Sequence, residues 1–170
     1  MSFARSLFER LMEAIVIALM AILAIVVTLG IVYRTAGAAL VWYDEVAGIL
    51  LAWLTFFGAA LGALKRAHIS VPEVMRLLAP RWRAAAFVVA EALVFAFFII
   101  AGWIGYHVMV VIEGSTLVSL PEVPQALAQS VIPIGAALYV IGEALSLPEA
   151  WRKTMADGRH GPIADVTASH

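Results

Sequence analysis

Ionisable side chains inside long apolar stretches are the residues of this chain that are best suited to chemistry. Glu91 is the deepest of them, since it follows Arg83 by eight residues within an apolar run. At ~1.5 Å per helical residue this places its carboxyl group roughly 12 Å along the helix. A cation or proton site is one interpretation; a structural hydrogen bond to a neighbouring helix is the commoner use of a single carboxylate. Glu13 and Glu143 lie nearer the ends of apolar runs, and we expect them at the membrane interface.

Three further charges flank one short connection. Arg34 ends the first apolar run, and Asp44 and Glu45 begin the second. All three fall at the same level if both runs are helices, so we expect a charge-assisted pair that closes this helical hairpin. Simple exposure to solvent is the alternative.

The positions of the histidines argue against a haem site. Axial ligation needs histidines on facing helices at matching depth, but His68 and His107 fall at opposite ends of their runs, and His160 and His170 lie near the C-terminus. The chain has no Cys, hence no disulfide and no thiol nucleophile. The sequence contains no phosphate-binding loop, metal-ligand cluster or nucleophile–base arrangement. We therefore predict neither an enzyme nor a bound cofactor or metal.

The composition indicates a helical membrane protein. Hydrophobic residues make up 64% of the chain, charged residues 14%, and the mean hydropathy is +0.98. The net charge is −1, and the Lys and Arg residues lie between the apolar runs rather than on one face. That distribution excludes a nucleic-acid-binding protein.

The apolar runs predict an all-α membrane protein with four transmembrane helices. We expect these spans at about 14–33, 42–64, 84–112 and 125–147, within one domain of residues 1–150, followed by a cytoplasmic tail, 151–170. The first run is too long for the hydrophobic region of a signal peptide, so we expect it to be retained. Pro133 removes a backbone donor and should bend the last span.

A short amphipathic helix is predicted at about 71–79. Ser70 and Glu73 form a capping box. Apolar residues then recur at helical spacing: Val71, Val74, Met75 and Leu78. The segment is too short to span, so we expect it on the membrane surface, with a solvated turn as the alternative.

The positive charges predict the orientation. Of the 11 Lys and Arg residues, only Arg34 lies on the side of the first and third connections. The positive-inside rule therefore places both termini in the cytoplasm. Six residues are expected to anchor this cytoplasmic side to lipid headgroups: Lys65, Arg66, Arg76, Arg81, Arg83 and Trp151.

One stretch, 42–80, carries a resemblance to a known family. Its features are an outer Trp42 with Asp44-Glu45, then Trp53, Gly58-Ala59, Arg66 with His68-Ile69, and Leu78 to Pro80. In order and spacing these resemble the small membrane subunit of a tripartite ATP-independent periplasmic (TRAP) transporter. Arg34 and Pro133-Ile134-Gly135 also fit, so the similarity covers roughly residues 30 to 145. Asp44 stands where the family usually has a second Glu.

The resemblance implies a function in a larger complex. Such a subunit pairs in the bacterial inner membrane with a large multi-span subunit, which binds substrate and coupling ions, usually Na⁺. A periplasmic binding protein delivers an organic acid, such as a dicarboxylate. This chain is then expected to act as a scaffold in ion-driven symport.

The surface that contacts the large subunit is predicted from the same stretch. The expected contact residues are Trp42, Glu45, Trp53, Gly58, Gly62 and His68. Gly58 and Gly62 form a GxxxG pattern, which allows the backbones of two membrane helices to approach closely. Two other functions stay open: an independent small transporter using Glu91, and a membrane anchor of an electron-transfer complex.

Overall fold

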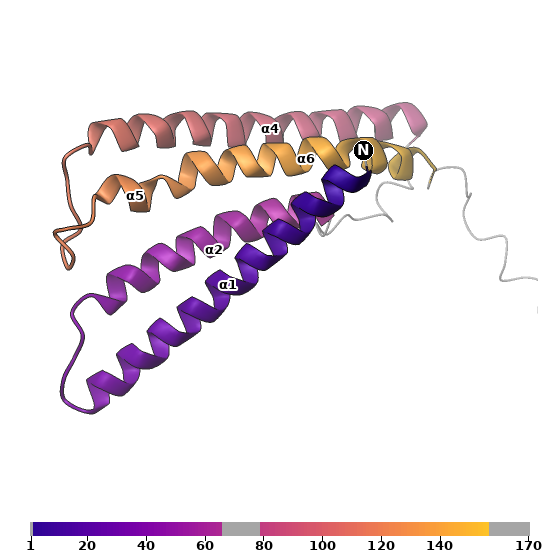
Figure 1. Ribbon diagram of the computed structural model, residues 1–170. Coiled ribbons are helices and arrows are strands. Elements are labelled where there is room, and N and C mark those ends of the chain that lie inside the picture. Colours follow the sequence, from indigo (N-terminus) through magenta and orange to yellow (C-terminus); the bar gives the residue numbers. More distant parts are fainter. Residues whose placement is uncertain (1, 66–78, 157–170) are drawn as a thin grey trace, which may run out of the picture.

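The described part of the chain is helical and contains the expected number of spans. The computed structural model describes residues 2–65 and 79–156. Its helices are α1 (Ser2–Thr35), α2 (Tyr43–Lys65), α4 (Pro80–Val111), α5 (Gln125–Gln129) and α6 (Val131–Ala156), as shown in Figure 1. Four stretches are long and apolar enough to cross a membrane: Arg5–Thr35, Tyr43–Lys65, Arg81–Val111 and Gln125–Arg152. The prediction of an all-α protein with four spans is confirmed. The predicted surface helix lies outside the described residues, apart from Ala79.

The observed helices begin and end at residues other than the predicted ones. Helix α1 begins at Ser2, well before the apolar run, because its polar start contains good helix formers. Pro80 occupies the first turn of α4, where a missing N–H costs nothing. Gly114 follows α4 with φ +90°, a conformation that suits glycine.

The last span is interrupted rather than smoothly bent. Helix α5 ends at Gln129, Ser130 is its C-cap residue, and α6 begins at Val131. Pro133 therefore lies in the first turn of α6, where its missing N–H is tolerated. Helix α6 then continues through Pro148 to Ala156.

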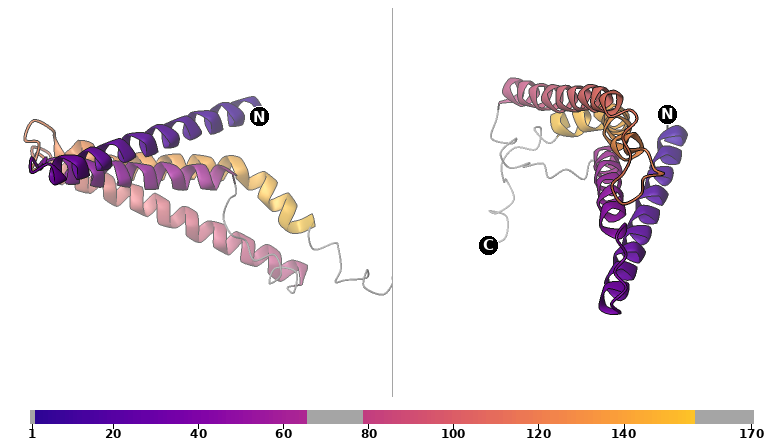
Figure 2. Two further views of the ribbon diagram at one scale, coloured as in Figure 1. Left: turned by 90° about the horizontal axis from the view of Figure 1, so that it is seen from below. Right: turned by 90° about the vertical axis from the view of Figure 1, so that its left-hand side faces the viewer.

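The long helices pack in a row in the order α1, α2, α6, α4. The main packing contacts join α1 to α2, α2 to α6, and α6 to α4, and the views in Figure 2 agree with this order. Helices α2 and α6 run in the same direction, and the start of α1 and the end of α6 lie at the same end of the row (Figure 1). Because α1 and α4 each have one main neighbour, most of their apolar surface stays exposed.

The core lies where α6 contacts both α2 and α4. Ala60, Ala63 and Tyr139 form a buried cluster, and the Phe98 ring of α4 stacks on Tyr139 with centroids 3.6 Å apart. Small residues allow the close approach: a Cβ added at Gly142 would lie 2.9 Å from the backbone oxygen of Ala60. A Cβ added at Gly135 would likewise collide with Phe56 of α2, so the tight glycine contacts between α2 and α6 are made by α6.

Candidate functional site

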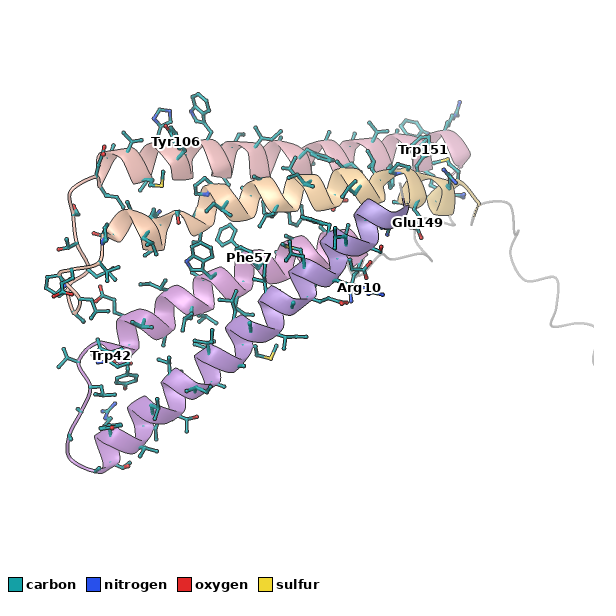
Figure 3. All side chains as sticks on the ribbon, viewed as in Figure 1. Arg10, Trp42, Phe57, Tyr106, Glu149 and Trp151 are labelled. Carbon is teal, nitrogen blue, oxygen red and sulfur yellow. The ribbon has the colours of Figure 1, made fainter. Side chains whose placement is uncertain are left out.

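Helix α2 leaves one face open. Its buried residues, Phe57, Ala60, Ala63 and Leu64, all lie in its second half, and Phe57 lies between α2 and α6 in Figure 3. Another side of the helix carries a stripe at three- and four-residue spacing, which we call the open face of α2: Gly48, Leu51, Thr55, Gly58 and Gly62. A Cβ added at any of its three glycines would meet nothing within 4 Å. Within residues 2–65 and 79–156, the GxxxG pattern therefore closes no contact.

The residues predicted to contact a partner do not share this face. Trp53 is half-buried on the Phe57 side of α2, and the two ring centroids are 5.5 Å apart. Trp42 is half-buried just before α2, and His68 lies outside the described residues. Of the six predicted residues, the structure places only Gly58 and Gly62 on the open face.

At the N-terminal end of α2, Glu45 is hydrogen-bonded to a loop rather than ion-paired with α1. The two carboxylate oxygens of Glu45 accept hydrogen bonds from the backbone N–H groups of Val118, at 3.1 Å, and Ser119, at 2.7 Å. Within residues 2–65 and 79–156, no ion pair joins Arg34 to Asp44 or Glu45. The predicted outer charge pair is thus not formed, because Glu45 faces the 112–124 connection while Arg34 and Asp44 are exposed. Backbone donors leave no signal in a sequence, so this contact was missed.

At the opposite end, ion pairs tie three helices together. Lys65 of α2 donates to Glu13 of α1 and lies 3.8 Å from Glu9. Arg5 of α1 lies 2.6 Å from Glu149 of α6, near the point where α1 and α6 converge in Figure 3. Partly exposed pairs of this kind contribute about 0–1 kcal/mol each. Lys65, predicted to anchor lipid, is therefore also part of an inter-helix network.

The other predicted lipid anchors divide into three groups. Arg83 is only 5% exposed, so it does not face lipid headgroups. It shares a helix face with Phe87, and the Phe87 ring packs edge-on against the Trp151 ring with centroids 5.5 Å apart. Arg81 and Trp151 are exposed, and their anchoring role stays a prediction. Arg66 and Arg76 lie outside the described residues.

The carboxylates within the spans differ from the prediction in one respect. Glu143, expected at the interface, is 3% exposed and therefore buried in α6. It belongs to a polar stripe with Tyr139 and Ser146, at positions i, i+4 and i+7, and this spacing could have identified it. The Ser146 hydroxyl is shared between two acceptors, the Glu143 carbonyl oxygen of its own helix at 3.0 Å and the Ala63 carbonyl oxygen of α2 at 3.2 Å, and the second contact links the helices.

Glu91 of α4 is half-buried and lies near the level of this stripe. Helices α4 and α6 are antiparallel, and Glu91 lies between two of their ring contacts, Phe98 with Tyr139 and Phe87 with Trp151. Glu91 and Glu143 both have interaction partners in the protein, which suits a structural role. Within residues 2–65 and 79–156, no group of three or more His, Asp or Glu side chains is arranged to hold a metal ion.

The fold shows the general class of this protein, and a comparison of its sequence shows the family. Four apolar helices of membrane length, packed in a row, make this a multi-pass helical membrane protein. The sequence matches the family described as "Tripartite ATP-independent periplasmic transporters, DctQ component" over residues 23–153. The chain therefore belongs to the DctQ family, the small permease subunits of TRAP transporters, and the resemblance found in the sequence is confirmed.

The family match limits the choice of function. DctQ proteins are transporter subunits rather than a family of enzymes. In TRAP complexes they work with a large membrane subunit and a binding protein. No curated protein is similar enough in sequence to count as a match.

Proposed function

We propose that this chain is a scaffold subunit that braces the large membrane subunit of a TRAP transporter. The observation that carries the proposal is the open face of α2, whose three glycines meet no packing partner within the described part of the chain. Small residues at three- and four-residue spacing let a second membrane helix approach closely. A helix of the large subunit therefore fits against Gly58 and Gly62.

The row of helices suits a static support. Polar groups within the spans, such as Ser146 and Glu143, are buried between helices instead of lining a route for a solute. Substrate and coupling ions, with Na⁺ as the expected ion, bind to the large subunit, and a periplasmic protein delivers an organic acid. Alternating access then takes place in the large subunit against this support.

The proposed orientation places both termini in the cytoplasm of a bacterium whose inner membrane holds the complex. The excess of Lys and Arg outside the spans supports it. Helix α4 then forms the edge that faces lipid. It exposes Trp82 near its start and Trp103 near its end; at ~1.5 Å per residue these are roughly 32 Å apart, close to the thickness of the hydrocarbon core. Arg81 and Trp151 anchor the cytoplasmic edge.

Co-purification tests the proposal. The tagged chain is expressed with the large subunit and purified from the membrane in mild detergent. We expect the wild-type chain to retain the large subunit, and Gly58→Leu and Gly62→Leu to lose it. Ala92→Leu, an exposed position on α4, serves as the matched control and should retain it.

Two results would contradict the proposal. A wild-type chain that purifies alone in several mild detergents would reject the scaffold function. Retention of the large subunit by both glycine variants would reject the open face of α2 as the contact surface, while leaving the complex itself established.

A further inference from the structure

The connection between α4 and α5 is an ordered segment. Backbone hydrogen bonds cross it from Leu117 N–H to the Val123 oxygen, at 3.0 Å, and from Gln125 N–H to the Ser115 oxygen, at 2.9 Å. Leu117 is 7% exposed, whereas its neighbour Val118 is 92% exposed. The segment therefore has a fixed shape, in which the Leu117 side chain packs inward and the N–H groups of Val118 and Ser119 donate hydrogen bonds to Glu45.

The long helices form two pairs, α1 with α2 and α4 with α6, which are joined by the packing of α2 on α6. In one pair, α1 and α2 meet closely at their connected ends, where the Tyr43 ring occupies the space beside Gly30. In the other pair, α4 and α6 meet at Gly102 and Ala136, where an added Cβ would lie 3.1 Å away. Each pair is held by its own packing.

The two pairs separate toward the outer end. Every buried residue of α2 lies at or beyond Phe57, and Figure 1 shows the first half of α2 diverging from α6. At the opposite end, the Arg5–Glu149 ion pair and the packing of Gly142 on Ala60 hold the two pairs together. The bundle is therefore clasped at one end, while Glu45 and the 112–124 connection bridge the divergence at the other.

We propose that residues 112–124 act as a strap that Glu45 closes, and that the closed strap sets the angle between the α1–α2 pair and the α4–α6 pair. Both carboxylate oxygens are used, one for each N–H, at 3.1 and 2.7 Å. Such charge-assisted hydrogen bonds are stronger than neutral ones and directional. Release of Glu45 frees the outer ends to separate, while the clasped end holds its position.

Spin-label distance measurements on the full chain in lipid nanodiscs test the strap. The chain has no native Cys, so spin labels attach only to the two cysteines introduced in each variant. One pair, Val32→Cys with Val111→Cys, reports the distance between the outer ends of α1 and α4. The second pair, Leu7→Cys with Ala85→Cys, reports the clasped end; all four positions are exposed.

Two variants distinguish loss of the Glu45 hydrogen bonds from a general effect of removing a charge. Glu45→Gln keeps the shape of the side chain but removes one acceptor oxygen, whereas Asp44→Asn removes the neighbouring charge at an exposed position. We expect Glu45→Gln to lengthen and broaden the outer distance distribution and to leave the inner one unchanged. Asp44→Asn should change neither.

Ser119→Pro provides a second route to the same contact. It removes the shorter hydrogen bond from the strap and leaves Glu45 intact, so it should reproduce the outer change even if Glu45→Gln yields little folded protein. An outer distribution that stays at the wild-type position and width in either folded variant overturns the proposal. Equal changes at both ends would also overturn it, because they would indicate general loosening.

Discussion

Replacing Gly142 with Ala tests whether α6 supplies the close contact that holds α2. The added Cβ would lie 2.9 Å from the Ala60 backbone oxygen and 3.5 Å from the Leu64 Cβ and backbone nitrogen. A backbone oxygen cannot rotate aside as the end of a long side chain can, so the helices must separate locally. Overpacking of this kind costs about 1–3 kcal/mol.

Gly62→Ala is the matched control for this prediction. The same substitution, also within a helix, would place its Cβ in open space. Replacing Gly by Ala raises helix propensity by about 1 kcal/mol at either site, so this gain cancels in the comparison. The difference between the two variants then reports the steric cost alone, a change of roughly 5- to 150-fold in the ratio of folded to unfolded chain.

Equilibrium unfolding of the isolated chain measures this difference. Detergent-solubilised protein is titrated with SDS, and unfolding is followed by far-UV circular dichroism and by the fluorescence of its five Trp residues. We expect Gly142→Ala to unfold at a lower SDS fraction than Gly62→Ala. Equal stability of the two variants, or greater stability of Gly142→Ala, would show that the α2–α6 contact does not depend on the missing side chain.

Two further predictions concern the polar groups within the spans. Ser146→Ala removes the hydroxyl at the Ala63 oxygen and should lower the free energy of unfolding by about 0.5–1 kcal/mol in the same titration. Ser130→Ala is the control, because the Ser130 hydroxyl bonds within its own segment. An equal loss of stability in Ser130→Ala would contradict an inter-helix role for Ser146. Glu91→Gln should leave uptake by the assembled transporter near the wild-type rate, because a scaffold needs no titrating group there; loss of uptake at normal abundance would instead favour a cation or proton site.

Much of the fold follows from composition and periodicity. Four apolar runs long enough to span a bilayer predict four helices without reference to how they pack, since lipid forces each segment to satisfy its own backbone hydrogen bonds. The residues at which the helices begin and end were harder to predict. The polar residues Arg5 and Glu9 extend α1 because charged residues such as these continue a helix easily outside the apolar run.

The candidate interface was predicted only in part. Gly58 and Gly62 lie on the open face of α2 and their contact with a partner stays a prediction, whereas the tight glycine contacts of α6 with α2 use Gly135 and Gly142. Both sets of glycines look alike in a sequence, because spacing identifies a helix face without showing what covers it. Arg83 and Glu143 were misplaced for a related reason: their depth could be counted along the chain, but their burial depends on neighbours distant in sequence.

The sequence alone determined the class of this protein, its four spans and its resemblance to the DctQ family, because hydropathy, charge distribution and motif order are properties of the chain itself. Only the tertiary structure decided that the helices pack in a row, that the open face of α2 lacks a partner within the described part of the chain, and that Glu45 holds the 112–124 connection. Those features arise from which helix faces meet. That choice depends on close packing and on backbone donors whose positions exist only once the chain has folded.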